Sequence, residues 1–491
     1  MSKKAVIIGA GFAGLSAAAF MANAGWEVTV VEKNKTAGGR AQQLLAEGFT
    51  FDMGPSWYWM PDVFERFFGQ FGKKVLDYYS LIRLDPSYRV YWNNGFTDIP
   101  ADYDQLKNLF ESIEKGSAQK LDHYLQEAFF KYKIGMQDLV YKPGQSLSEF
   151  LDWNVVKNVF KLDVFSSIRS HVGKYFKDKR LKQIMEFPVL FLGALPENTP
   201  ALYSLMNYAD MVGGTWYPMG GMYTVVKGMQ RLAEEQGAKF LFEHEAKRIV
   251  VEKDIAKKLI TDKSEFSADV IISGADYYFT EFNLLPERYR SYSENYWQKK
   301  QLAPSCLLYY IGLNKKLEAV VHHSLFFDVP FEQHATEIYT DPKWPSEPLF
   351  YLSVCSNTDD NVAPKGCENI VVLVPVASGL KNDSEELREH YFQKIINRLE
   401  KHTNQSITDA IVFKKTFSVS DFVSEYNSYR GNAYGLANTL RQTANLRPSC
   451  RSKKIKNLFY TGQFTVPGPG VPPSLISGEV VSKQVLKHFK N

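Results

Sequence analysis

The strongest constraint on the fold lies in the first 32 residues of the chain. A short apolar run, residues 5–8, leads into the sequence GAGFAG, an alanine-rich segment over residues 15–24 and a second apolar run that ends at Glu32. The apolar runs are typical of buried parallel strands, and the alanine-rich segment is typical of a helix. The order strand, glycine-rich turn, helix and strand predicts a βαβ unit that binds a dinucleotide.

Each glycine of this turn has a physical role. Gly9 permits the tight turn out of the strand, Gly11 lets the backbone approach a pyrophosphate, and Gly14 lets the helix pack closely on the sheet. Phe12 and Ala13 fall in the first turn of the helix, where free N–H groups and the helix dipole stabilise phosphate charge. All five residues are therefore expected to hold the cofactor.

The residues after the second strand indicate which dinucleotide binds. The Glu32 carboxylate can accept hydrogen bonds from ribose hydroxyls and would repel a 2′-phosphate, which argues against NADP. Lys33 follows directly and belongs to the same expected site. In the sequence TAGGR, Gly39 and Arg40 can return the chain to the pyrophosphate and supply a guanidinium. NAD dehydrogenases have no regular need for such a group, so FAD is the predicted cofactor.

The C-terminal part of the chain carries a second group of turn residues. A predicted strand over residues 457–461 runs into Gly462 and Gln463, and the sequence GVPPS, with Val471 and Pro472, leads into a final helix. A late strand and helix that return to the first domain are what is needed to close around a flavin ring.

Length and composition exclude several classes of function. A chain of 491 residues predicts two or three structural units. A net charge of +4, from 58 basic and 54 acidic residues, implies no nucleic-acid partner. The four cysteines show no CxxC spacing, so no metal site is expected, and they are expected to be reduced thiols in a cytosolic protein. No stretch reaches the ~20 apolar residues of a membrane-spanning helix, which predicts a soluble or peripheral protein.

Longer segments carry a resemblance to a known family. They are VIIGAGFAGLSAAAFMANAGWEVTVVEKNKTAGGRAQQL, GFTFDMGPSWYWMPDVF, WYPMGGMYTVVKGM, ADVIISGADYYFTE, YNSYRGNAYGLANT and NLFYTGQFTVPGPGVPPSLISGE. Together they resemble the bacterial and fungal carotenoid desaturases of the phytoene desaturase type, over nearly the whole chain. Among flavoproteins, FDMGPS and TVPGPG are the segments most specific to this family.

The resemblance implies an α/β fold with two parts. One is an FAD-binding, Rossmann-like domain of the two-dinucleotide-binding (GR2) type, shared with the amine oxidases, and the other is a mixed α+β substrate domain. We expect the FAD-binding domain to be discontinuous, over residues 1–70, 211–290 and 441–491. The substrate-binding and membrane-associating domain would take residues 71–210 and 291–440.

The same resemblance assigns site residues. Gly9, Gly11, Gly14, Glu32, Gly39 and Arg40 match family positions that hold the ADP part of FAD. Pro55, Ser56 and Trp57 match the segment beside the flavin. Ala246 stands where related flavoproteins usually have a valine whose backbone contacts the adenine. Gln463 stands where many related enzymes have an acidic residue that holds the ribityl hydroxyls, and a glutamine can still hydrogen-bond there.

The implied activity is that of an FAD-dependent oxidoreductase acting on CH–CH bonds, which dehydrogenates phytoene stepwise toward neurosporene and lycopene. One hydrogen would leave as a hydride to the flavin and the other as a proton, with little acid–base help because the developing cation is allylic. Glu149 is the candidate proton acceptor, since SLSEFL resembles a family segment that carries an acid. Its spacing from Ser146 is also that of a helix capping box, which is the simpler interpretation.

The expected partners are a lipophilic polyene and a membrane surface. Trp57 and the three residues after it follow the flavin-contacting turn and could line an apolar tunnel, with core packing as the alternative. Residues 288–300, RYRSYSENYWQKK, mix basic and aromatic side chains on an expected helix, which suits a membrane interface or an ordinary solvated face. We expect a cytoplasmic protein associated peripherally with the cytoplasmic membrane, with oxygen or a quinone as electron acceptor.

Other functions remain open at this stage. An amine oxidase would share the fold, although FDMGPS and PGPGVP speak against it. A desaturase of a later, hydroxylated carotenoid, such as a 3,4-desaturase, a carotene isomerase or a retinol saturase would share the flavin half, so the motifs barely separate them. A flavin-binding module without turnover is the alternative from another class.

Overall fold

The computed structural model describes residues 2–137, 139–144, 163, 166–439 and 441–490. At its centre lies a five-stranded parallel sheet of order β19-β13-β1-β2-β9. The strands are β1 (Lys4–Ile8), β2 (Glu27–Val31), β9 (Lys239–Leu241), β13 (Val270–Ser273) and β19 (Leu458–Tyr460). Parallel strands need helical crossovers that cover the sheet, which explains the near-continuous apolar runs of β1 and β13.

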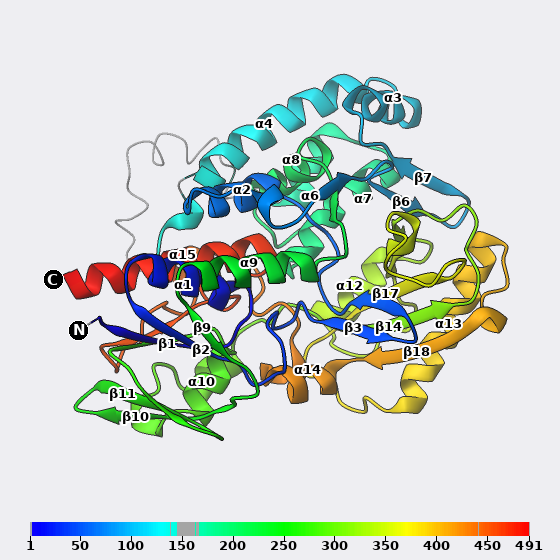
Figure 1. Cartoon of the computed structure of the whole chain (residues 1–491). Coiled ribbons are helices and arrows are strands. Elements are labelled where there is room, and N and C mark those ends of the chain that lie inside the picture. Colours follow the sequence, from blue (N-terminus) through cyan, green and yellow to red (C-terminus); the bar gives the residue numbers. More distant parts are fainter. Residues whose placement is uncertain (1, 138, 145–162, 164–165, 440, 491) are drawn as a thin grey trace.

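Helices cover one face of this sheet, and a small antiparallel sheet lies on the other side (Figure 1). The covering helices are α1 (Phe12–Asn23), α9 (Tyr223–Glu235) and α15 (Val471–Lys490). The opposite side carries β10 (Ala246–Glu252), β11 (Ile255–Thr261), β12 (Glu265–Ser267) and α10 (Tyr277–Asn283). The αβ layers therefore combine segments from the beginning, middle and end of the chain.

A second, seven-stranded sheet has the order β18-β14-β17-β16-β15-β6-β7 and is antiparallel apart from the parallel pair β15 and β6. Its strands are β6 (Tyr88–Tyr91), β7 (Phe96–Ile99), β14 (Ser305–Leu313), β15 (His323–Phe326), β16 (Phe350–Ser353), β17 (Glu368–Val376) and β18 (Ile411–Phe417). All nine residues of β14 are buried. Apolar side chains of α13 (Glu385–Thr403) share a core with one face of this sheet.

Two antiparallel pairs of strands lie outside these larger sheets. In one of them, β3 (Gln43–Ala46) pairs with β4 (Phe49–Asp52), and β4 contacts β17 of the larger sheet. A Cβ at Gly312 of β14 would lie 2.6 Å from the ring of Phe49, so the glycine makes room for this packing. In the other, β5 (Leu81–Arg83) pairs with β8 (Trp216–Pro218).

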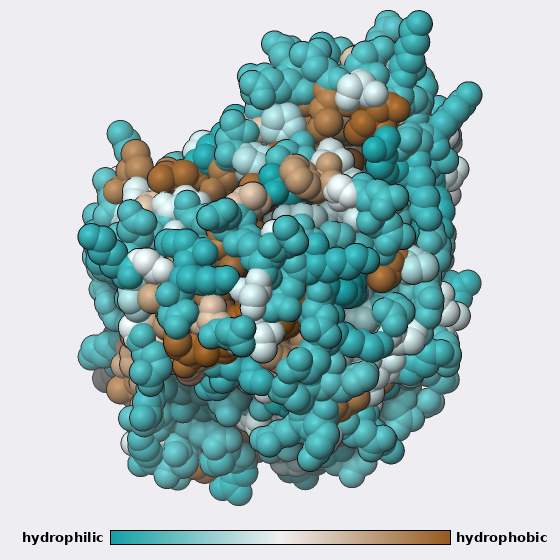
Figure 2. All heavy atoms as spheres, turned by 90° about the vertical axis from the view of Figure 1, so that its right-hand side faces the viewer, coloured by the Kyte–Doolittle hydropathy of each residue, from teal (hydrophilic) through white to brown (hydrophobic). Residues whose placement is uncertain are grey.

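The remaining helices lie mostly in the upper part of the view in Figure 1. They are α2 (Pro61–Gly69), α3 (Tyr103–Ile113), α4 (Ser117–Gln137), α6 (Ile168–Tyr175), α7 (Lys179–Glu186), α8 (Leu205–Met211), α11 (Glu294–Gln298), α12 (Phe331–Tyr339) and α14 (Val419–Tyr426). Within the described ranges, no helix combines the length and the apolar character needed to cross a membrane. Figure 2 shows a mostly hydrophilic face with several separate hydrophobic areas.

The expectation of one helix over residues 288–300 is wrong. The segment forms a short 3-10 turn, Glu287–Tyr289, followed by the five-residue helix α11. Trp297 is fully buried and packs against Tyr277 at 5.4 Å and Phe464 at 5.7 Å between ring centroids. Its side chain is therefore part of the core and is not free to lie at a membrane surface.

Candidate functional site

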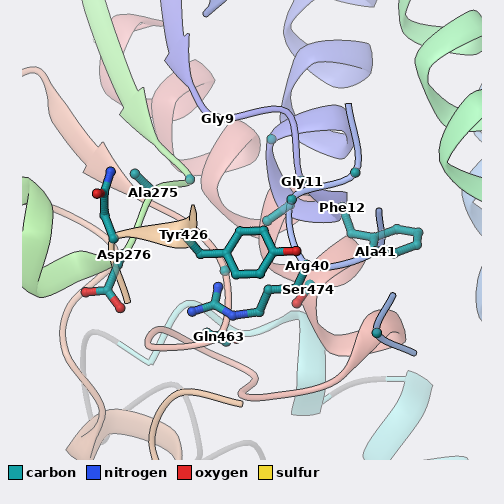
Figure 3. A pocket seen from close by; sticks show the side chains of 18 of the residues that line it. Gly9, Gly11, Phe12, Arg40, Ala41, Ala275, Asp276, Tyr426, Gln463 and Ser474 are labelled. Carbon is teal, nitrogen blue, oxygen red and sulfur yellow. The ribbon is translucent and has the colours of Figure 1, made fainter. Parts of the chain in front are cut away.

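A deep cleft opens at the carboxyl ends of the central parallel strands. Gly9 follows β1, Glu32 follows β2, Gly274 follows β13 and Gly462 lies just beyond β19, and all four line the cleft. Carboxyl ends of parallel strands are the usual ligand edge of such sheets, because the loops there leave a crevice between helices. Figure 3 shows Gly9 and Gly11 on the first turn, facing side chains from the far end of the chain.

The glycine turn is shaped by close contacts. Gly9 has a φ of +92°, and a Cβ on Gly14 would lie 2.0 Å from the Gly9 carbonyl oxygen, so neither position accepts a side chain without a shift. A Cβ on Gly39 would lie 3.2 Å from Cα of Gly11, which brings the TAGGR turn against the first one. Helix α1 begins after Gly11 with no side-chain cap and no acid in its first turn. Its N–H groups are therefore available to an anion.

The Glu32 carboxylate is buried and held by two backbone donors. The N–H of Ala10 donates to Oε2 at 2.8 Å, and the N–H of Asn34 donates to Oε1 at 3.0 Å. Burial raises the pKa of Glu32, and these hydrogen bonds oppose that shift. The carboxylate thus has a fixed orientation at the edge of the cleft.

Arg40 brings a buried cation into the cleft. Its Nη2 donates to Ser428 Oγ at 3.0 Å and to the Asn432 carbonyl at 3.4 Å, and its guanidinium lies 5.7 Å from the centre of the Tyr426 ring. Figure 3 shows the Arg40 and Tyr426 side chains together in the cleft. Within the described chain, Nε of Arg40 is buried without a hydrogen-bond partner. A buried, partly unsatisfied guanidinium beside an uncapped helix fits the pyrophosphate of a dinucleotide.

Asp276 is a cleft residue that the sequence did not single out. It lies three residues beyond the end of β13, whereas Glu32 directly follows β2, and an acid just after an apolar strand was the available signal. Its carboxylate accepts hydrogen bonds from the N–H groups of Phe279 at 3.3 Å and Tyr429 at 3.0 Å. Burial raises the pKa of Asp276, whereas the nearby Arg40 charge lowers it. Asp276 thereby joins the parallel sheet to the loop before Tyr434.

The C-terminal turn closes the cleft. Gly462 has a φ of +108° and donates its N–H to Ser477 Oγ of α15 at 2.9 Å. Nε2 of Gln463 lies 3.1 Å from Asn432 Oδ1, and its carbonyl accepts from Arg447 at 2.6 Å. The turn is therefore fixed from both sides.

The Asp52 carboxylate links the FDMGPS segment to the PMGGM segment. Its carboxylate accepts from the N–H groups of Met222 at 2.7 Å and Tyr223 at 3.2 Å, at the start of α9. A Cβ on Gly221, whose φ is +91°, would lie 2.7 Å from that carboxylate. Burial raises the pKa of Asp52 to about 7. Asp52 thus positions the following Gly54 and the residues next to it.

An apolar cavity adjoins the cleft. Its walls include Trp57 and Trp59, Phe187, Phe327 and Leu349. The residues that line both spaces are Gly54, Pro55, Cys306, Leu373, Tyr434, Gly470 and Val471. A long apolar molecule in the cavity would therefore meet the inner end of a dinucleotide in the cleft.

The predicted site residues that are described gather in these two spaces. The cleft is lined by Gly9, Gly11, Phe12, Ala13, Gly14, Glu32, Lys33, Gly39, Arg40, Pro55, Ala246, Gly462, Gln463 and Val471. Ser56, Trp57 and Pro472 line the apolar cavity instead. Glu149, the candidate proton acceptor, lies outside the described residues. Cys306, Tyr426 and Tyr434 line the cleft but were missed, because no local motif marks a strand or loop residue that tertiary packing brings in.

Comparison with known proteins identifies the family. The model of the flavin-containing amine oxidoreductases matches residues 12–486. A carotenoid 3,4-desaturase from Haloarcula japonica is 41% identical over 483 residues, which cover 98% of this chain and 97% of that protein. The chain belongs to the carotenoid desaturases of this flavoprotein family.

Other relatives agree with this assignment. A phytoene desaturase from Phycomyces blakesleeanus is 31% identical over 99% of the chain and 86% of its own length, and a zeta-carotene-forming phytoene desaturase from Myxococcus xanthus is 28% identical over 99% and 94%. An oxidoreductase from Methanosarcina mazei superposes with a TM-score of 0.64 at 16% identity, covering 98% of this chain and all of that one. Putrescine oxidase superposes with a TM-score of 0.60 at 14% identity, covering 99% of each chain. These structures share the amine-oxidase-like fold.

Family membership defines the chemistry in broad terms. The chain is an FAD-dependent oxidoreductase that desaturates carotenoids, and its cofactor is FAD. Bound FAD supplies a hydride acceptor. The chain's own groups fit that cofactor: an uncapped helix start, the Arg40 guanidinium and the Glu32 carboxylate.

Proposed function

We propose that this desaturase introduces a double bond at the 3,4 position of an acyclic, hydroxylated carotenoid. The observation that carries the proposal is the 41% identity to a carotenoid 3,4-desaturase over almost the full length of both chains. The phytoene desaturases share 28% and 31%. Phytoene desaturation, favoured by the sequence motifs, is the second candidate, because these relatives also cover 99% of the chain.

The apolar cavity supports a polyene substrate. Aromatic and aliphatic side chains form most of its wall, and burial of such surface stabilises a long hydrocarbon by about 25 cal/mol per Å². Ser56, Tyr339, Tyr351 and Tyr434 place hydroxyl groups in the same wall. A hydroxylated end group could form hydrogen bonds there that a plain hydrocarbon could not.

We also propose the division of labour within the chain. Residues 1–70, 211–290 and 441–491 would hold FAD through the fourteen predicted residues that line the cleft. Residues 71–210 and 291–440 would bind the carotenoid and associate with membrane. Delivery of so apolar a substrate favours a peripheral position on the cytoplasmic membrane, with a quinone or oxygen as electron acceptor.

Pigment analysis tests the substrate. The chain is expressed in three bacterial hosts that accumulate phytoene, lycopene or a 1-hydroxylated acyclic carotenoid, and extracts are separated by chromatography with absorption spectra. A product with one more conjugated double bond in the hydroxylated host, and unchanged phytoene, would support 3,4-desaturation. Neurosporene or lycopene in the phytoene host would instead support phytoene desaturation, the second candidate.

A further inference from the structure

A hydrogen-bonded chain of polar groups lies in the wall of the apolar cavity. Ser56 Oγ lies 2.9 Å from the Tyr351 hydroxyl oxygen, and that oxygen lies 2.6 Å from Nδ1 of His323. Ser56 and Tyr351 line the cavity, whereas His323 lies behind them and is fully buried. Ser56 directly follows Gly54 and Pro55, which line both the cavity and the FAD cleft. This row of hydrogen-bonded groups therefore begins where the substrate cavity meets the cofactor cleft.

The imidazole of His323 is held in place. The Trp57 ring stacks on it with 4.3 Å between ring centroids and an interplanar angle of 12°. Within the described chain, Nε2 of His323 is buried and has no hydrogen-bond partner. Burial and the neighbouring His322 lower the pKa of His323 well below its usual value. The ring is therefore neutral, and the lone pair of Nδ1 can accept the hydrogen bond of the Tyr351 hydroxyl.

A second histidine leads from this position toward solvent. The His322 ring contacts the His323 ring edge to face at 4.4 Å between centroids. Nδ1 of His322 lies 2.7 Å from Oγ1 of Thr358, which is half-buried in the turn after β16. Ring contact and hydrogen bonds thus place four polar groups, from Tyr351 to Thr358, in a row that starts at the cavity wall and ends at a half-buried residue.

We propose that Tyr351 and His323 accept the proton that leaves the carotenoid during desaturation. A carotenoid C–H bond breaks, and its electron pair stays in the substrate as the new π bond. The proton binds the Tyr351 oxygen while the Tyr351 proton passes to Nδ1 of His323. The hydride and its two electrons leave from the adjacent carbon by the desaturase activity itself. The proposal rests on carotenoid desaturation and holds for either candidate bond.

The test compares single substitutions in the holoenzyme. Tyr351→Phe removes the cavity hydroxyl and His323→Gln removes the base. Tyr309→Phe is the control, because the Tyr309 hydroxyl donates to the Arg388 carbonyl and lines neither the cavity nor the cleft. Anaerobic stopped-flow absorbance measures the rate of flavin reduction by carotenoid in liposomes. We expect Tyr351→Phe and His323→Gln to lower this rate by roughly 100-fold or more, as loss of a general base does. Tyr309→Phe should stay near the wild type, and all variants should retain FAD.

Two further readouts separate proton transfer from a structural role. The wild type should show a solvent deuterium isotope effect on flavin reduction that is lost in Tyr351→Phe. Without substrate, the ¹⁵N resonance of His323 Nδ1 should shift in Tyr351→Phe and stay unchanged in Tyr309→Phe. If His323→Gln does not fold, Tyr351→Phe alone decides.

Three outcomes would overturn the inference. The first is a Tyr351→Phe enzyme with the wild-type rate and isotope effect. The second is a change in KM alone, which would make Tyr351 a substrate-binding group. The third is a wild-type enzyme whose flavin no carotenoid reduces, which would also remove the desaturase function, whereas the first two leave it intact.

Discussion

At the scale of single residues, the site depends on buried charges that backbone groups hold in place. Glu32 accepts two backbone N–H groups, and Asp52 and Asp276 each do the same elsewhere. Glu32 was predictable because the glycine motif places an acid after the second strand. Asp52 and Asp276 were not, because each accepts from an N–H group, of Met222 and Tyr429 respectively, that lies more than a hundred residues away and that only folding brings near.

Glu32→Gln should weaken FAD binding. An amide has one acceptor oxygen, so its NH₂ group would face a backbone N–H that now donates to a carboxylate oxygen. Loss of a charge-assisted hydrogen bond costs about 1.5–3 kcal/mol, which is roughly 10- to 100-fold in Kd. Quenching of FAD fluorescence on titration of the apoprotein measures this. Glu27→Gln, at an exposed position of the same strand, is the control, and equal Kd values would contradict the assigned role of Glu32.

His334 should make the protein less stable in mild acid. The Leu349 N–H donates to Nδ1 at 2.9 Å, so Nε2 must carry the proton donated to the Pro375 carbonyl at 2.8 Å. Burial lowers the pKa of His334 to about 4. As the pH falls below 6.5, the unfolded chain takes up a proton that the folded one does not, and stability decreases until about pH 4.

The lowered pKa of His334 corresponds to a loss of about 2 kcal/mol in the free energy of unfolding between pH 7 and pH 5. The melting temperature of His334→Gln should therefore fall less between these pH values than that of the wild type, even if the variant is less stable at pH 7. His390→Gln changes an exposed histidine of α13 and should follow the wild type. If the melting temperatures of all three proteins fall by the same amount between pH 7 and pH 5, His334 is not the group responsible.

At the scale of elements, α15 packs closely against α1, and the first turns of both helices line the cleft. A Cβ on Gly478 of α15 would lie 2.5 Å from the Ala13 carbonyl and 2.6 Å from Cβ of Ser16. Ser16 Oγ donates to the Leu475 carbonyl at 2.7 Å. The final helix was predictable from its apolar pattern after GVPPS, but its partner helix was not, because periodicity shows an apolar face without showing what covers it.

Gly478→Ala should destabilise the protein despite the higher helix propensity of alanine. The added methyl group meets backbone atoms that cannot move aside, and overpacking of this kind costs about 1–3 kcal/mol. Chemical denaturation of the holoprotein measures the free energy of unfolding. Lys487→Ala, at an exposed position of the same helix, should change it by no more than about 0.5 kcal/mol. An equally stable Gly478→Ala protein would mean that the two helices can separate without cost.

Residues 288–300 show how composition misleads at this scale. Basic and aromatic side chains alternate there as they do on a membrane-surface helix. Six aromatic rings nevertheless lie within 6.2 Å of the Trp297 ring, between centroids, and exclude it from the surface. Tertiary packing decides the exposure of such a segment, and the sequence does not record that packing locally.

At the scale of the whole molecule, the cleft is walled by both sheets. Residues that follow β1, β2, β13 and β19 form one side, and residues of β14, β17 and the loops around α14 form the other. The glycine motif and the C-terminal turn predicted the residues of the first side that follow β1, β2 and β19, but not Asp276 after β13. The second side, with Cys306 and Tyr434, and the chain from Tyr351 to His323 arise from a sheet whose strand order no single segment encodes.

FAD should therefore stabilise the entire chain as one unit. A ligand that binds the folded state alone adds about 2.7 kcal/mol at a free concentration 100 times its Kd. Differential scanning calorimetry of the apoprotein and the holoprotein should show one transition that moves to higher temperature with FAD. Two transitions, of which FAD moves only one, would show that the sheets unfold independently.

The strand order of the central sheet also has a consequence for biosynthesis. β19 adds to the outer side of β13, and α15 then covers α1, so both complete a layer begun long before them. Because the ribosome delivers a chain from its N-terminus, the nascent protein exposes an unpaired edge at β13 until these last segments emerge. Cofactor loading must therefore follow translation of the cleft's final wall, and until then a chaperone has an open strand edge to protect.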